Sequence, residues 1–107
     1  MGRGESPSRV RFEYRPAVQA DYNDALNFYE MAGENLADRF DAEFKSIVAD
    51  IKAAPRRFPF YLRSRIFRCA RLTSFPFLVV YRERPGAIRV AVLKHERRHP
   101  RFGMSRR

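Results

Sequence analysis

Residues 75–96 read FPFLVVYRERPGAIRVAVLKHE, and this stretch decides the fold. Phe77–Glu83 is rich in β-branched and aromatic residues, which favour strands. Ala87–His95 is similarly rich in valine, leucine and isoleucine, and Pro85-Gly86 between the two segments supplies turn residues. The stretch therefore predicts a β-hairpin.

Two further strands are expected upstream of this hairpin. Ile66–Leu72 is a strand candidate that the turn residues Thr73-Ser74-Phe75-Pro76 connect to the hairpin. At about 8–14, apolar and charged residues alternate with a period of two, the pattern of a strand with one buried face. The apolar members of this alternation are Val10, Phe12 and Tyr14.

Two helices are expected between the first strand and the others. Pro16 suits a first helical turn, apolar residues follow at helical spacing, and Gly33 suits a helix end. A second apolar pattern runs from Leu36 to Ile51, and Pro55 ends it. Because the turn is short, the helices must fold back antiparallel. The order β-α-α-β-β-β predicts an α+β fold, with a helical hairpin packed on one face of a mostly antiparallel sheet.

Length and composition predict one domain over residues 1–107, with 45% hydrophobic residues to form its core and with flexible tails at 1–7 and 101–107. The single cysteine, Cys69, excludes a disulfide framework and fits a reducing compartment, so we expect a cytoplasmic protein. The longest apolar run, Phe75–Tyr81, is far shorter than the ~20 residues that span a bilayer, so no membrane partner is expected.

Positive charge is concentrated in the second half of the chain. The net charge is +10, which divides into −3 for residues 1–55 and +13 for residues 56–107. Nineteen of the 22 basic residues are arginine, whose planar fork suits phosphate and carboxylate. This balance favours an acidic or polyanionic partner over a neutral metabolite.

The element order and several landmarks together resemble the RelE/ParE superfamily of bacterial toxins from type II toxin-antitoxin modules, over nearly the whole chain. The closing motif is most similar to the ParE-like, plasmid-stabilisation branch. The landmarks are Ala20-Asp21-Tyr22, Ala25, Phe28-Tyr29, Leu36 to Phe44, Pro55, Phe58-Pro59, Arg71, Phe75-Pro76-Phe77, Val80-Tyr81-Arg82 and His95-Glu96-Arg97-Arg98-His99-Pro100.

The resemblance implies a growth-inhibiting toxin that a cognate acidic antitoxin holds inactive, with no metal and no other cofactor. An initially disordered antitoxin segment would lay apolar side chains over the helical hairpin and carboxylates over the arginines. The candidate antitoxin-binding residues, which could equally be core, are Tyr22, Phe28, Tyr29, Phe40 and Phe44.

RelE-like members cut messenger RNA on the ribosome without metal, a reaction that needs a base, an acid and cations around the phosphate. If this chain is such a ribonuclease, the resemblance implies catalytic roles for Arg71, His95, Arg98 and His99, with a stacking role for Phe102. The connector at 56–65 has no lysine, and its arginines are poor proton donors at neutral pH. The set of catalytic groups that a ribonuclease needs is therefore incomplete, and whether the protein is an enzyme stays open.

ParE-like members instead poison DNA gyrase, which requires a docking surface and no proton transfer. A basic sheet face and tail would meet that demand more easily, so gyrase is favoured slightly over the ribosome and its messenger RNA. A non-toxic basic nucleic-acid-binding module is a third possibility. The candidate target- or nucleic-acid-binding residues are Arg63, Arg65, Arg68, Arg71, Arg82, Arg89, Arg97, Arg98 and Phe102.

Each candidate also has a purely structural interpretation. His95 ends a strand and can simply hydrogen-bond a neighbouring carbonyl, and His99 is similar. Arg71 and Arg98 can be solvated forks on a sheet face. Cys69 lies inside a strand pattern and is expected to be a small buried hydrophobe.

Overall fold

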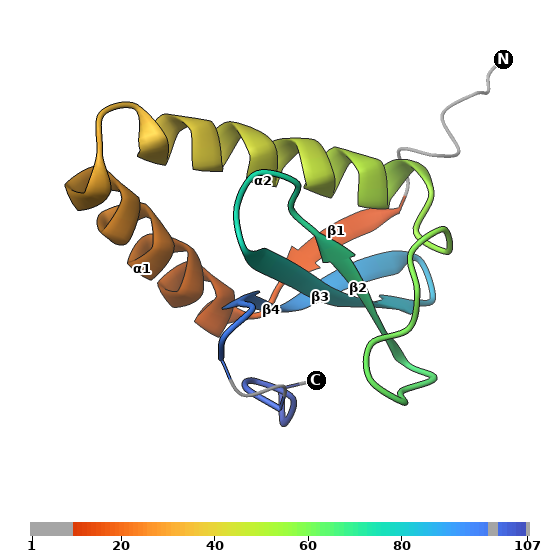
Figure 1. The fold of residues 1–107 in the computed structure, drawn as a ribbon. Coiled ribbons are helices and arrows are strands. Elements are labelled where there is room, and N and C mark those ends of the chain that lie inside the picture. Colours follow the sequence, from red (N-terminus) through yellow and green to blue (C-terminus); the bar gives the residue numbers. More distant parts are fainter. Residues whose placement is uncertain (1–9, 99–100, 107) are drawn as a thin grey trace, which may run out of the picture.

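A computed structural model describes residues 10–98 and 101–106 and has the expected element order, β-α-α-β-β-β (Figure 1). Both helices and the last three strands lie within a residue or two of their predicted bounds. The described part of the first strand begins at Arg11, later than predicted. The elements are β1 (Arg11–Tyr14), α1 (Pro16–Ala32), α2 (Leu36–Ala53), β2 (Phe67–Arg71), β3 (Phe77–Arg84) and β4 (Ala87–His95).

The four strands form one mixed sheet in the order β1-β4-β3-β2. β3 pairs antiparallel with both neighbours, and the β3–β4 hairpin that the sequence predicts is confirmed. In its turn Gly86 has a φ of 71°, a backbone angle that glycine adopts at little cost in free energy. β1 lies parallel to β4 at the edge, so the chain crosses over through both helices before it returns to the sheet.

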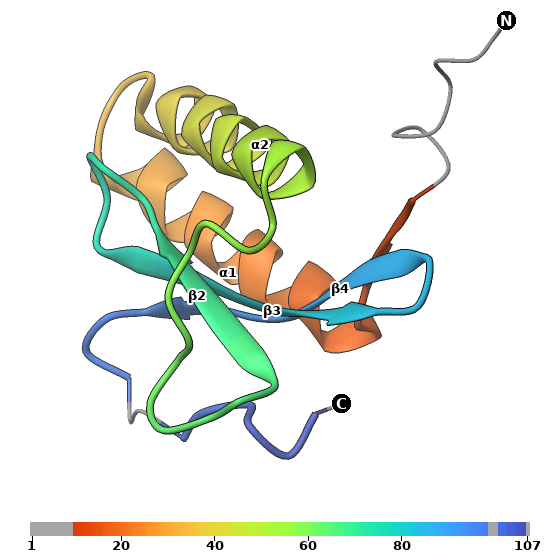
Figure 2. The same cartoon turned by 90° about the vertical axis from the view of Figure 1, so that its right-hand side faces the viewer.

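Both helices cover the same face of the sheet, as Figure 2 shows. Apolar side chains at helical spacing turn inward from each helix and meet alternate residues of the strands. Phe40 and Ile51 of α2 and Val79, Tyr81 and Val90 of the sheet have no exposed surface. The fold class is therefore α+β with a helical hairpin on one face, as predicted.

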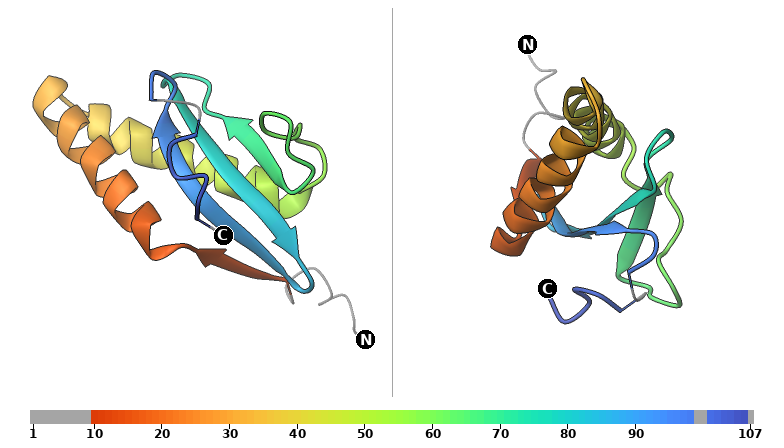
Figure 3. Two further views of the ribbon diagram at one scale, coloured as in Figure 1. Left: turned by 90° about the horizontal axis from the view of Figure 1, so that it is seen from below. Right: turned by 60° about the vertical axis from the view of Figure 1, so that its left-hand side comes forward.

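The other face of the sheet carries a second, smaller core. The connector before β2 and the segment after β4 cover it, and Figure 3 shows the C-terminal segment crossing the strands on this side. Residues 101–106 therefore pack on the sheet, whereas the sequence predicted a flexible tail there. The small core consists of Tyr61, Phe67, Leu78, Val80, Ala91 and Val92, with Cys69, Phe102 and Met104 packed against it.

Within the described residues, neither helix is long and apolar enough to cross a membrane.

Candidate functional site

A groove of about 240 Å³ lies where β4 ends, between α1 and the C-terminal segment. His95 comes from the last position of β4, and Arg98 and Phe102 come from the chain that follows. Asp24 and Phe28 line the opposite wall from α1. Three residues that the sequence singled out for function thus meet at one place. We call this site the C-terminal groove.

His95 is held in one orientation by its surroundings. Its Nδ1 accepts a hydrogen bond of 3.0 Å from the backbone N–H of Arg97, and its ring lies edge-on to Phe77 at 5.2 Å between centroids. The hydrogen bond and the ring contact together fix the plane of the imidazole. The purely structural interpretation of His95 predicted a hydrogen bond to a neighbouring carbonyl, whereas the partner found here is the backbone N–H of Arg97.

Arg98 is exposed and stacks on Phe102, with its guanidinium carbon 4.6 Å from the ring centroid. The guanidinium of Arg106 lies 5.4 Å from the same ring. Among the described residues, Arg98 has no carboxylate partner. An arginine that is positioned by stacking and is not paired with an acid can still offer its fork to an anion.

An ion pair between Asp21 and Arg106 holds the C-terminal segment against α1 and β4. The guanidinium donates to the carboxylate at 2.7 Å and to the carbonyl of Ala91 at 3.0 Å, and the same carboxylate accepts the N–H of Leu93 at 3.2 Å. The two side chains are only 8% and 18% exposed. Sequence reasoning quoted Asp21 as a landmark without a role and missed Arg106, which has no periodic pattern around it.

Arg71 lies at the end of β2 and forms an ion pair with Glu96. Leu78 of β3 pairs with Arg71 of β2 on one side and with Lys94 of β4 on the other. Lys94 is only 3% exposed, and burial lowers the pKa of its amine. Sequence reasoning missed Lys94. The feature that could have indicated it is its place in a strand, directly after a run of apolar residues. Cys69, expected to be fully buried, is half-buried against the smaller core, and its partial burial raises the pKa of its thiol.

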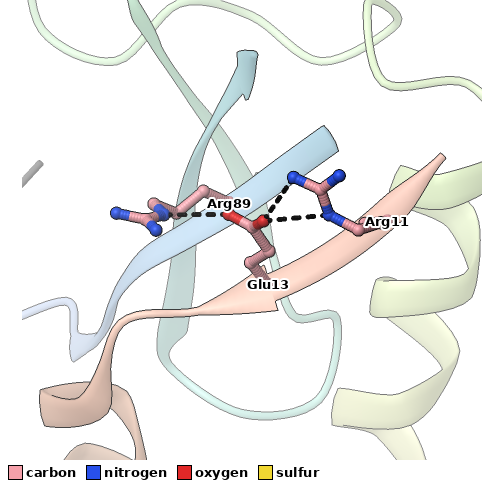
Figure 4. A network of polar contacts seen from close by, with 3 residues as sticks. All are labelled: Arg11, Glu13 and Arg89. Atoms are coloured by element: carbon pink, nitrogen blue, oxygen red, sulfur yellow. Dashed lines mark hydrogen bonds and ion pairs between the residues drawn. The ribbon is translucent and has the colours of Figure 1, made fainter. Parts of the chain in front are cut away.

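Arg89 of β4 is also paired with an acid. Its Nε donates to Glu13 at 3.2 Å, and Arg11 donates to the same carboxylate from the other side at 3.0 Å (Figure 4). The hydrogen bond from Arg11, and then that from Arg89, holds the pKa of Glu13 below its usual value. The expectation of one continuous basic sheet face is therefore wrong, because Arg71 and Arg89 are engaged with carboxylates.

The remaining predicted arginines divide into two groups. Arg97 is exposed beside the C-terminal groove. The other group lies at the opposite end of β2, where the connector meets the sheet. Its members are Arg63, Arg65, Arg68 and Arg82.

The predicted antitoxin-binding aromatics also separate into two classes. Tyr29, Phe40 and Phe44 are buried in the main core, so a partner cannot contact them in this conformation. Tyr22 is half-buried, and its hydroxyl hydrogen-bonds Asp41 across the helical hairpin. Phe28 is 64% exposed on α1 and is the member that a partner can cover. Met31 of α1, which the sequence analysis did not single out, is 89% exposed.

His99 lies outside the described residues. Among the residues that the structure describes, no group of three or more histidine, cysteine, aspartate or glutamate side chains could hold a metal ion.

Residues 12–100 match the family model of the ParE toxin of the type II toxin-antitoxin system parDE. The chain belongs to the ParE toxin family. Among solved structures, it is similar to one from the chromosomal ParDE toxin-antitoxin system of P. aeruginosa, with a TM-score of 0.70 and 13% sequence identity. That similarity covers 81% of this chain and 96% of the other. No curated protein sequence gives a significant match.

The ParE family match covers both helices and the sheet except for Arg11, the first residue of β1, and it ends before the C-terminal segment. Arg98 lies inside the matched range, whereas Phe102, on which it stacks, and Arg106, which pairs with Asp21, lie beyond it. This ParE family member therefore carries its C-terminal groove partly on the family domain and partly on residues outside it.

Proposed function

We propose that this ParE family member is the toxin of a type II toxin-antitoxin module and stops growth by poisoning DNA gyrase. The observation that carries the proposal is the exposed guanidinium of Arg98, which is stacked on Phe102 and is paired with no acid among residues 10–98 and 101–106. With Arg97 beside it, it offers positive charge to an acidic patch on the target. Such a target places the protein in the cytoplasm.

A ribosome-dependent ribonuclease is the second candidate, because His95 and Arg98 line the same groove. Two features weaken it. Arg71, the other cation expected at the phosphate, is engaged by Glu96, and Lys94, the amine whose pKa is lowered, is buried. A proton-transfer group must reach within hydrogen-bond distance of its substrate, which Lys94 cannot do at 3% exposure.

The proposed antitoxin is acidic and docks on the helical hairpin. Phe28 and Met31 are exposed one turn apart on α1, the spacing at which an amphipathic segment meets a helix face. An antitoxin that covers Phe28 also reaches the C-terminal groove, because Phe28 forms part of its wall. Binding at this place would block Arg98, which explains how the antitoxin neutralises the toxin.

The test is DNA supercoiling by purified gyrase in the presence of the purified toxin. We expect the wild-type protein to inhibit supercoiling and to accumulate cleaved DNA, and we expect Arg98→Ala to lose most of this inhibition. Arg39→Ala is the matched control, because Arg39 is an exposed arginine on α2 outside the groove. Cleavage of messenger RNA on ribosomes, with supercoiling unaffected, would replace gyrase by the ribosome as the target.

A further inference from the structure

A second basic groove lies at the end of the sheet where β2 begins and β3 ends. It has a volume of about 260 Å³ and is lined mainly by polar atoms. Arg71 and the C-terminal groove lie at the other end of β2, so the two sites are distinct. We call it the connector groove. Its lining residues are Phe60, Arg65, Ile66, Arg68, Arg82 and Glu83.

Arg68 is fixed in the connector groove by three contacts. Its guanidinium stacks over Phe60 at 4.1 Å and donates to the carbonyl of Phe58 at 2.6 Å and to that of Arg56 at 3.3 Å. Phe60 is itself held beside β2 by an isolated β-bridge to Arg68. The positive charge of Arg68 therefore stays at the groove, and no carboxylate in the described part of the chain pairs with it.

Arg82 brings a second cation whose hydrogen bonds are incomplete. Its Nε is buried and has no hydrogen-bond partner in the described structure. A buried donor without a partner is costly. Arg82 also lines the groove, where the rest of its guanidinium can donate to an anion. Glu83, the acid that lines the groove, is engaged by Arg56 at 3.1 Å.

The connector loop adds exposed arginines on a rigid support. Ser64 accepts the N–H groups of Ile66 and Phe67 at 2.9 and 2.8 Å, so the loop is closed by its own hydrogen bonds. Arg63 and Arg65 are exposed on this loop, and Phe60 and Ile66 are 38% and 46% exposed. Several guanidinium forks and an aromatic ring thus share one small surface.

We infer that the connector groove binds the phosphodiester backbone of a nucleic acid. Guanidinium forks match phosphate oxygens in pairs, and a stacked arginine or aromatic ring offers a platform to a neighbouring base. The mainly polar lining favours phosphate over the apolar side chains of a docking peptide. This inference goes beyond the proposed function, since a toxin that acts on a protein requires no groove for nucleic acid.

The experiment measures fluorescence anisotropy of a short labelled oligonucleotide with the full chain, between about 50 mM and about 200 mM salt. Single-stranded DNA, duplex DNA and single-stranded RNA are separate arms, which identify the nucleic acid that fits. We expect Arg65→Gln and Arg82→Gln together to weaken binding at least about tenfold and to lower the salt slope by about 2, whatever the base sequence.

Arg39→Gln is the control, because it removes an exposed arginine outside the groove. It should change binding less than about twofold. If the double variant melts at a lower temperature than the wild type, Arg65→Gln alone, at an exposed loop position, replaces it.

Equal losses in the double variant and the control would overturn the inference, as would binding that salt does not affect. The inference would also be overturned if the double variant bound oligonucleotides as the wild type does but no longer bound an acidic protein partner. A growth-arrest assay tests the proposed function separately from this inference. A variant whose connector groove is defective can still have an intact C-terminal groove.

Discussion

Tyr81 is the largest fully buried side chain among the described residues and joins the sheet to the chain after α2. Its hydroxyl donates a hydrogen bond to the carbonyl of Pro55. Burial raises its pKa to about 12, because the phenolate would lose its hydration in the core. The residue therefore stabilises the fold only while it keeps its proton.

Replacement of Tyr81 by phenylalanine should lower the free energy of unfolding by about 1 kcal/mol near neutral pH, through loss of one hydrogen bond. The folded pKa exceeds the unfolded pKa, so this contribution is complete below about pH 10 and is lost as pH rises towards about 12. Urea unfolding at several pH values checks this: the difference between Tyr81→Phe and wild type should shrink above pH 10. A difference that is constant or grows would contradict it.

Gly103 lies where the C-terminal segment crosses the sheet. It has a φ of 75°, and a Cβ there would lie 2.7 Å from a methyl group of Val92, which is fully buried. Gly86 has a similar φ of 71° but open space around it. Both positions favour glycine for its backbone, and only Gly103 also requires its small size.

Gly103→Ala should therefore detach the C-terminal segment, whereas Gly86→Ala should cost only about 1 kcal/mol of backbone strain. Limited trypsin digestion checks this prediction, because Arg101 and Arg106 become cleavable once the segment leaves the sheet. Equal protection of the segment in both variants would show that the contact with Val92 is not needed.

At the element scale, the sequence predicts the helices and the β3–β4 hairpin well, because their signals are local. Pro16 and Gly86 mark boundaries through their own backbone preferences. Gly33 ends α1 as predicted, but at an extended φ of 176° and not in the left-handed conformation expected of it. The partner of β1 is not local information, since its parallel pairing with β4 depends on a crossover through both helices. The packed C-terminal segment was missed for the same reason, because its contacts are with α1 and β4.

The Asp21–Arg106 pair couples α1 to the C-terminal segment and can be measured by a double-mutant cycle. Asp21→Asn and Arg106→Gln should each destabilise the protein by about 2 to 3 kcal/mol, because each leaves a largely buried charge without its partner. The double variant should lose much less than the sum, which gives a coupling energy of at least about 1 kcal/mol. Chemical denaturation supplies the values, and strictly additive losses would contradict the coupling.

At the scale of the whole molecule, the sequence correctly predicts a basic second half but not how its arginines are distributed. Carboxylates of β1 and of the chain after β4 reach Arg89 and Arg71. Such pairs join residues far apart in the chain and cannot be read from charge counts. Of the predicted binding arginines, Arg98 lines the C-terminal groove, and Arg65, Arg68 and Arg82 line the connector groove.

The candidate site was predicted in part for a related reason. His95, Arg98 and Phe102 follow one another closely in the chain, so their meeting at one groove needs little tertiary information. Three aromatics assigned to antitoxin binding lie in the core, because a helical apolar stripe does not reveal which members face the sheet.

Induced expression in a bacterial host is the most direct test of whether this ParE family member is a toxin that acts through Arg98. Growth should stop on induction of the wild-type protein and continue with Arg98→Ala, while the two purified proteins melt within a few degrees of each other, as surface substitutions usually do. Normal growth with soluble wild-type protein, or an Arg98→Ala variant that arrests growth as well as the wild type does, would contradict the account.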